Sequence, residues 1–205
     1  MTVPIILIGG GGHSTACMDV IEAEGKYHIA GIVDKKEKIG TSVLGYGIIA
    51  ADDRIEELAG KYDHFLVSVG QIKTAETRKR FFFLLENLCV NLPVVISPYA
   101  VVSRHAGIDK GTIVMHQALV NAGAVIGKNC ILNSKALIEH GVKVGDHCHI
   151  STGALVNGDV HIEADCFIGS GAVIREGIHI GERSVIGAGA RVMKNVDPGS
   201  KIKPG

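Results

Sequence analysis

Residues 125–150 read VIGKNCILNSKALIEHGVKVGDHCHI, with an aliphatic side chain at every sixth position. The same spacing continues without a break from Ile108 to Val192. A helix with a period of 3.6 cannot keep positions six apart on one face for so long, and a half-buried strand would place apolar residues at every second position. A fixed short period is typical of a β-solenoid, in which each repeat buries its apolar residue against the next coil.

A second feature of the repeat is a small residue four positions after most of the aliphatic ones. These small residues are Ala118, Ala124, Cys130, Ala136, Cys148, Ala154, Cys166, Ala172 and Ala190. Glycine often follows the aliphatic residue directly, as at Gly127 and Gly145. We therefore expect an aliphatic core with glycine near the corners of each coil.

The motifs VIGKNC, VGDHCH, FIGSGA and HIGERS resemble those of the hexapeptide acyltransferases. The resemblance implies a left-handed parallel β-helix in which three hexads make one coil. Cys130, Cys148 and Cys166 follow one another at intervals of three hexads and would stack as an internal ladder in such a helix. We interpret them as small buried side chains and not as catalytic or metal-binding groups.

Composition excludes several classes of function. The chain has 21 basic and 21 acidic residues among 205, so no net charge favours nucleic acid or an anionic membrane surface. Five cysteines without a CxxC spacing argue against a disulfide framework and for a reducing compartment. The first residues lack a basic segment, and no apolar run is long enough for a signal or a membrane span. We expect a cytoplasmic protein.

Residues 1–92 are predicted to form a small Rossmann-like parallel α/β domain, and residues 93–205 the β-helix. The expected strands are VPIILIG, HIAGIVD and HFLVSVG. We expect a first helix capped by Ser14 or Thr15, a second over residues 52–58 and a third over residues 74–88. Ligands of such sheets bind at the carboxyl ends of the strands, beside helix N-termini.

The glycine-rich turn after the first strand has two interpretations. A dinucleotide fingerprint would need a third glycine where Ser14 stands, so it is incomplete. The string IGGGGHSTACMDVIE, with VSVGQ later, instead resembles the nucleotide-sugar domain of the PglD- and NeuD-like bacterial sugar acetyltransferases. The resemblance implies that His13 contacts the sugar and that Asp34 contacts the base, expected to be uracil, although His13 as a simple turn residue stays an alternative. The matched substrate-binding positions are Gly10, Gly11, Gly12, His13, Asp34, Lys35, Gly70 and Gln71.

The same family resemblance covers LNSKALIEHGVKVGDHCHISTGALVNGDV. It implies that His140 is the catalytic base, beside Glu139, and that the N–H of Gly158 stabilises the oxyanion. Asn133 and His149 would lie near the acetyl group. An imidazole suits the chemistry, because an amine must lose a proton as it attacks the thioester of acetyl-CoA.

Two departures from the family pattern are visible. The acid that directly follows the catalytic histidine in related sequences is Gly141 here, so Glu139, Asn133 or a neighbouring subunit is left to orient the ring. The resemblance places the coenzyme along SVIGAGARVMKN, at Ala188, Gly189 and Lys194. The ending VDPGSKIKPG is shorter than the usual family ending, which leaves open that part of the coenzyme site is missing.

The prediction is therefore an acetyl-CoA-dependent N-acetyltransferase of a nucleotide-linked amino sugar, without a metal, that works as a homotrimer with active sites between subunits. O-acetylation of a sugar hydroxyl is the nearest alternative. A metal hydratase built on solenoid histidines would need a pair five residues apart, which His147 and its neighbours do not offer. A non-catalytic nucleotide-sugar sensor is the third alternative. Lys35, in place of a second acid, leaves the identity of the base open.

Overall fold

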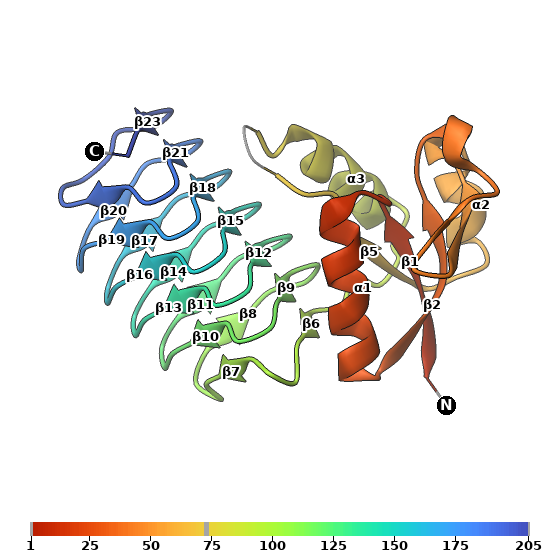
Figure 1. Cartoon of the computed structure of the whole chain (residues 1–205), viewed down its shortest axis with the longest axis horizontal. Coiled ribbons are helices and arrows are strands. Elements are labelled where there is room, and N and C mark those ends of the chain that lie inside the picture. Colours follow the sequence, from red (N-terminus) through yellow and green to blue (C-terminus); the bar gives the residue numbers. More distant parts are fainter. Residues whose placement is uncertain (1, 72–73, 205) are drawn as a thin grey trace.

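The structure is a computed structural model that describes residues 2–71 and 74–204. An α/β unit at the N-terminal side is followed by a long prism of short strands (Figure 1). The prism is a left-handed parallel β-helix, as the resemblance to the hexapeptide acyltransferases implies. None of the helices in the described parts of the chain is both long and apolar enough to cross a membrane.

The N-terminal sheet has the strand order β3-β4-β2-β1-β5. Its members are β1 Val3–Ile8, β2 Tyr27–Val33, β3 Ser42–Val43, β4 Tyr46–Ala50 and β5 His64–Val67. β1 pairs in parallel with β2 and β5, and β2 with β4, so the predicted parallel sheet is confirmed. The sequence analysis missed the antiparallel hairpin of β3 and β4, which extends one edge.

Three α-helices accompany this sheet in the described residues: the first two connect its strands, and the third leads from β5 to the β-helix. They are α1 Gly12–Glu24, α2 Ile55–Ala59 and α3 Glu76–Asn87, with short 3₁₀ turns at Lys36–Lys38 and Asp52–Arg54. The predicted helix cap is wrong: the N-cap of α1 is Gly11, with no side-chain cap. Ser14 is already inside the helix, where its hydroxyl donates to Ser68 Oγ at 3.2 Å. The first-turn N–H groups are therefore left without a capping side chain.

The β-helix has three faces, named here in chain order. The first face consists of β6 Val95–Ile96, β9 Ile113–Val114, β12 Ile131–Leu132, β15 His149–Ile150, β18 Phe167–Ile168, β21 Val185–Ile186 and β23 Lys201–Ile202. The second consists of β7 Val101–Val102, β10 Leu119–Val120, β13 Leu137–Ile138, β16 Leu155–Val156, β19 Val173–Ile174 and β22 Arg191–Val192. The third consists of β8 Gly107–Ile108, β11 Val125–Ile126, β14 Lys143–Val144, β17 His161–Ile162 and β20 His179–Ile180.

Successive coils are in register, each offset from the last by three hexads. Leu137 pairs with Leu155, and every strand of a face pairs in parallel with its neighbours. The aliphatic series from residue 108 to residue 192 forms one apolar core, with the small residues packed beside it. Cys130, Cys148 and Cys166 lie buried in that core as free thiols, which confirms the predicted ladder.

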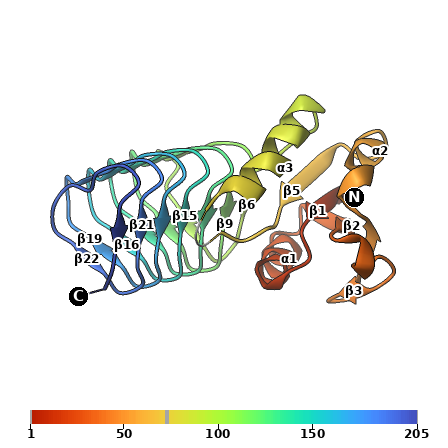
Figure 2. The ribbon, with the colours of Figure 1, turned by 90° about the horizontal axis from the view of Figure 1, so that it is seen from above.

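The two parts of the chain share an apolar contact. The side chains of Met18 and Ile21 on α1 belong to the same buried cluster as Ile113, Met115 and Ile131 of the first coils. α1 accordingly lies alongside β6 and β9 (Figure 1), and α3 reaches toward the same face when the molecule is viewed from above (Figure 2).

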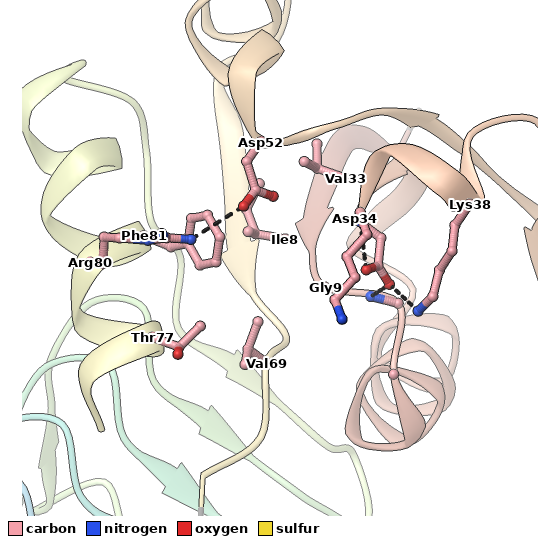
Figure 3. Close-up of a pocket in the computed structure, with 13 residues that line it drawn as sticks. Ile8, Gly9, Val33, Asp34, Lys38, Asp52, Val69, Thr77, Arg80 and Phe81 are labelled. Carbon is pink, nitrogen blue, oxygen red and sulfur yellow. Dashed lines mark hydrogen bonds and ion pairs between the residues drawn. The ribbon is translucent and has the colours of Figure 1, made fainter. Parts of the chain in front are cut away.

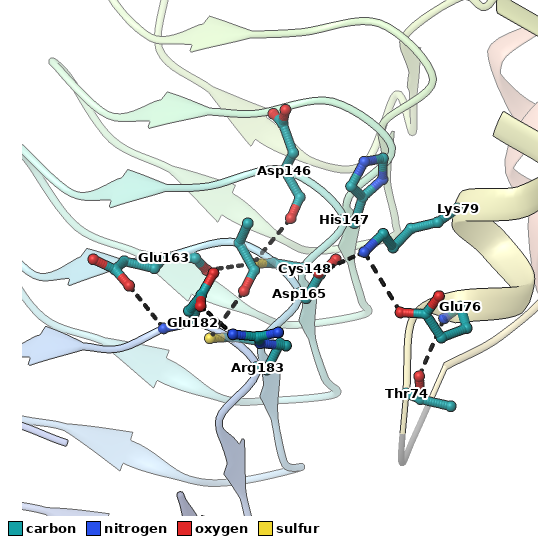
Figure 4. Close-up of polar contacts among 12 residues, drawn as sticks. Thr74, Glu76, Lys79, Asp146, His147, Cys148, Glu163, Asp165, Glu182 and Arg183 are labelled. Atoms are coloured by element: carbon teal, nitrogen blue, oxygen red, sulfur yellow. Dashed lines mark hydrogen bonds and ion pairs between the residues drawn. The ribbon is translucent and has the colours of Figure 1, made fainter. Parts of the chain in front are cut away.

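The second contact is polar and is made by α3. Lys79 donates to Asp165 Oδ2 at 2.7 Å and lies 3.5 Å from Glu76 (Figure 4). His147 packs edge-on against the rings of Phe82 and Phe83. These contacts fix α3 to a corner of the β-helix, and Gln71, after β5, lies beside the first face, where its carbonyl accepts from His149 Nδ1.

Candidate functional site

A first cavity lies at the carboxyl ends of β1 and β2, where the glycine turn begins (Figure 3). Its volume is about 300 Å³. Asp34 and Lys38 form one wall, and Arg80 and Asp52, 3.2 Å apart, form the opposite wall. Gly10 also lines the cavity, and its lack of a side chain keeps the space open beside Asp34. Such an opening suits a nucleotide placed over exposed backbone N–H groups.

The carboxylate of Asp34 is held by three donors. Its Oδ2 accepts from the Gly10 N–H at 2.9 Å and from Lys38 Nζ at 2.8 Å, and Oδ1 accepts from the Lys35 N–H at 2.7 Å. Burial alone would raise the pKa of Asp34, but these hydrogen bonds outweigh it and lower the pKa. Asp34 is thus an anion that fixes the glycine turn, with little accepting capacity left for a ligand.

A second cavity, of about 510 Å³, lies between the glycine turn and the first face of the β-helix. It brings together residues that are far apart in the sequence. They are Gly11, Gly12, His13, Ala16, Ser68, Gly70, Gln71, Asn133 and His149. Seven of the predicted site residues therefore line one space, and Gly11 borders both cavities.

The hydrogen bonds of His149 define its tautomer. Nδ1 donates to the carbonyl of Gln71 at 2.7 Å, so Nε2 accepts from Asn133 Nδ2 at 3.2 Å. Burial lowers the pKa of His149 to about 4. For the same reason, and with the positive charge of Arg78 nearby, the pKa of His13 is lowered to about 3. Both rings are neutral at pH 7 and offer hydrogen bonds, not charge, to a ligand.

Arg78 lies behind this cavity and is fully buried. Its guanidinium donates to the carbonyls of Val67 and Val69, at 3.2 and 2.7 Å, and to the carbonyl and side-chain oxygens of Asn129, both at 2.8 Å. Burial lowers the pKa of Arg78 to about 10, so it stays cationic at neutral pH. It joins the end of β5 to the β-helix and fixes the wall of the second cavity.

His140 lies elsewhere, at the corner that follows β13 on the second face. Oε2 of Glu139 accepts from His140 Nδ1 at 3.3 Å, from the His140 backbone N–H at 3.2 Å and from Asn121 Nδ2 at 2.9 Å. Chiefly the Asn121 hydrogen bond lowers the pKa of Glu139, which is therefore ionised at neutral pH. A proton on Nδ1 leaves Nε2 as the basic nitrogen of an exposed ring.

Gly158 lies one coil beyond His140, directly against its ring. A Cβ added at Gly158 would stand 2.6 Å from His140 Nε2 and 2.7 Å from Cε1, so any side chain there would displace the ring. The predicted trio of Glu139, His140 and Gly158 is thus assembled at one corner. The trio lines neither cavity described above. It lies at the end of a second-face strand, whereas the second cavity, with His13 and His149, lies against the first face of the same chain.

Comparison with known proteins decides the family. Residues 4–82 match the model of the PglD N-terminal domain, and residues 123–158 and 159–194 match the bacterial transferase hexapeptide model (six repeats). The structure superposes on the acetyltransferase domain of PglB from Neisseria gonorrhoeae FA1090 with a TM-score of 0.90 and 30% sequence identity, over 98% of this chain and 96% of that chain. The chain belongs to the PglD-like family of hexapeptide-repeat sugar acetyltransferases.

Two further solved structures resemble this PglD-like acyltransferase. A histidine-to-asparagine variant of perosamine N-acetyltransferase from Caulobacter crescentus, in complex with CoA and GDP-perosamine, has a TM-score of 0.91 and 26% identity, over 98% of this chain and 93% of that chain. The PglB domain in complex with acetyl coenzyme A has a TM-score of 0.88 and 29% identity, over 99% and 97% of the two chains. A search of the curated proteins found no match.

The remaining predicted residues of this PglD-like chain lie near the last coils. Lys194 lines a third cavity, of about 450 Å³, together with Arg191, Asn195 and Ser200. Ala188 and Gly189 are exposed one turn before it. Among the described residues, no group of three or more His, Cys, Asp or Glu side chains is arranged to hold a metal ion.

Two residues of this PglD-like site were missed by the sequence analysis. Arg78 shares the buried face of α3 with Phe82 and Leu85, so an arginine at an apolar helical position was the available signal. Asn121 stands three hexads before Glu139, in the same register of the preceding coil. The period of three hexads per coil was therefore enough to predict that Asn121 lies beside Glu139.

Proposed function

We propose that this enzyme transfers the acetyl group of acetyl-CoA to the amino group of a nucleotide-linked sugar, with His140 as the general base. The observation that carries the proposal is the corner at which Glu139 holds Nδ1 of His140 and Gly158 lies against Nε2. A related structure supports the substrate class, since it holds CoA and GDP-perosamine. We retain UDP as the nucleotide to test first, with GDP beside it.

The proposed step is a direct attack without an acyl-enzyme. The amine nitrogen attacks the thioester carbonyl, and His140 Nε2 takes the amine proton as the C–N bond forms. The N–H of Gly158 donates to the oxygen of the tetrahedral intermediate. The C–S bond then breaks, and the proton passes from His140 to the departing CoA thiolate. Glu139 fixes the tautomer throughout and stabilises the imidazolium.

The coenzyme is proposed to lie along the last coils. Lys194 and Arg191 line one cavity there and supply two cations for phosphate groups of CoA. Acetyl-CoA would deliver the thioester, and the chain would hold its pantetheine arm beside the exposed backbone at Ala188 and Gly189. The sugar nucleotide is proposed to occupy the first two cavities, with its phosphates over the glycine turn.

A trimer is proposed because one chain separates the two halves of the site. On the second face, from β7 to β19, the residue just before each core aliphatic residue is itself aliphatic and points outward, so these side chains form a row at the surface. Val101 and Leu155 in this row are 64% and 37% exposed. The row consists of Val101, Leu119, Leu137, Leu155 and Val173. His140 lies at the corner that follows Leu137 of this row. A second copy that covers the row would bring its own sugar-binding cavity to this base.

The test is a thiol-release assay with acetyl-CoA and a panel of UDP- and GDP-linked amino sugars. We expect His140→Ala to lower kcat by at least about 100-fold, the usual scale for a general base. His161→Ala, an exposed histidine on the third face, is the matched control and is expected to leave turnover unchanged. Near-normal turnover in His140→Ala would remove this residue from the mechanism.

The trimer has its own test. Leu155→Lys places a charge in the aliphatic row, whereas Val125→Lys places one at the 53% exposed Val125 of the third face. In sedimentation equilibrium, we expect the native protein and Val125→Lys to have three times the 21.6 kDa mass of one chain. Leu155→Lys is expected to be a monomer without turnover. A fully active Leu155→Lys monomer contradicts the shared site.

A further inference from the structure

The carboxylate of Asp159 lies over Gly141, the residue that directly follows His140. Both positions have left-handed backbone, with φ of 67° at Gly141 and 57° at Asp159, and they stand one coil apart. The N–H of Asp159 donates to the carbonyl of His140 at 3.0 Å. A Cβ added at Gly141 would meet Asp159 Oδ1 well inside van der Waals contact. The space that a side chain at residue 141 would fill is therefore taken by this carboxylate.

The ring of His140 leans in the opposite direction, over Gly158. Because Gly158 directly precedes Asp159, the imidazole and the carboxylate share one corner. The imidazole extends over the coil of Asp159, and the carboxylate extends over the coil of His140. Nδ1 of His140 is already held by Glu139. The Asp159 carboxylate thus shares this corner with the imidazole without an ion pair to it, and it is not required to orient the ring.

Asp159 also lacks a partner within the parts of the chain that the structure describes. Its side chain is exposed, and neither the side-chain hydrogen bonds nor the ion pairs of residues 2–71 and 74–204 include its carboxylate. The comparable carboxylate of Asp146, which lies over Gly127 at another corner, accepts the Lys128 N–H at 2.8 Å. Of these two carboxylates, that of Asp159, at the same corner as His140, is therefore the one available to bind a ligand.

We propose that Asp159 binds the amino group of the acceptor sugar and selects an amine over a hydroxyl, an inference that rests on the proposed function. As the amine nitrogen attacks the thioester carbon, the new C–N bond leaves positive charge on nitrogen until His140 removes the proton. The electron pair of the breaking C–S bond leaves on the CoA sulfur. A nearby carboxylate stabilises the cationic nitrogen. A hydroxyl that attacks after losing its proton carries negative charge on oxygen, which the same carboxylate repels.

The experiment compares two acceptors, a nucleotide-linked amino sugar and its counterpart with a hydroxyl in place of the amine. Asp159→Asn keeps the shape and tolerates the left-handed backbone. We expect it to lower kcat/KM for the amine by about 10- to 100-fold. Turnover of the hydroxyl acceptor is expected to stay unchanged or rise. Asp146→Asn is the matched control and is expected to change neither.

A second variant reaches the same carboxylate without altering it. Gly141→Ala would push Asp159 out of its position, and we expect the same selective loss with the amine. Equal losses for both acceptors in Asp159→Asn, or an unchanged amine rate, overturn the role of Asp159 while the native activity still supports the acetyltransferase. A native enzyme that acetylates neither acceptor overturns the proposed function and this inference together.

Discussion

The ring of His140 rests against the α-carbon of Gly158, one coil further along the β-helix. The two residues are separated by three hexads, so they occupy the same corner position in successive coils. No residue with a Cβ fits at Gly158 without moving the imidazole, because three ring atoms lie within 3.3 Å of the position it would occupy. The location of the ring is therefore set by the absence of a side chain in the next coil.

Gly158→Ala is expected to impair catalysis without unfolding the protein. The backbone at Gly158 is not in the left-handed region, so alanine is tolerated there, but the added methyl displaces the exposed ring of His140. We expect a loss of about 10-fold or more in kcat, on the order seen for a misplaced base. The thiol-release assay measures it. Gly107→Ala, where an added Cβ meets nothing within 4 Å, serves as the control for both rate and thermal stability.

Arg78→Met is expected to destabilise the protein strongly. The substitution keeps the approximate volume but leaves the carbonyls of Val67 and Asn129 without their buried donors. We expect the free energy of unfolding to fall by about 3 kcal/mol or more, measured by urea denaturation. Arg80→Met changes an arginine of the same helix that is 66% exposed, and the cost there is expected to stay below about 1 kcal/mol. Equal costs would mean that the buried hydrogen bonds of Arg78 contribute little.

His149 predicts a loss of stability in acid. Its pKa of about 4 in the folded protein lies below the ordinary value of 6.5, so between these values the unfolded chain binds the extra proton. The stabilisation is complete above about pH 6.5 and is lost as the pH falls toward 4. We expect this site alone to lower the free energy of unfolding by about 2 kcal/mol between about pH 7.5 and pH 5. His149→Gln should flatten the urea midpoint against pH; an unaltered slope would contradict the assignment.

The cysteine ladder predicts unreactive thiols. Cys89 is exposed, whereas Cys17, Cys130, Cys148 and Cys166 are buried, and burial raises the pKa of Cys17 to about 12. An aromatic disulfide reagent is expected to titrate one thiol per native chain and all five in denaturant. Cys148→Ala should retain turnover near the native rate, since the proposed mechanism involves no acyl-enzyme. A rapid second thiol, or an inactive Cys148→Ala that remains folded, would contradict this role.

Local spacing was sufficient to predict the β-helix, because each hexad repeats the same demand for one buried aliphatic residue. Ile96 and Val102 continue the aliphatic series two hexads before Ile108, within the β-helix predicted for residues 93–205. The run LPVVIS, at residues 92–97, contains β6, which pairs with β9 and is the first strand of the β-helix. A two-residue strand such as β3 is too short to show the alternation of apolar and polar residues from which a strand is predicted.

The family resemblance, and not spacing, named Glu139, His140 and Gly158. The coil period explains why the three meet at one corner, because they are local or one coil apart. The approach of His13 to His149, with ring centroids 6.2 Å apart, depends on how the first part of the chain docks on the β-helix. No short-range pattern specifies such a contact. Family resemblance named both histidines; it implies that His149 lies near the acetyl group, which stays a prediction, and in the structure His149 lines the cavity beside the glycine turn.

The apolar cluster that joins α1 to Ile113, Met115 and Ile131 bears on how such proteins can be recombined. A chimaera cut at the start of the β-helix would strip the first coils of the helix that covers them and expose aliphatic surface. A crossover after β12 would carry that cover along with the coils beneath it. An exchange of the N-terminal α/β unit between relatives should therefore include the opening coils that α1 covers.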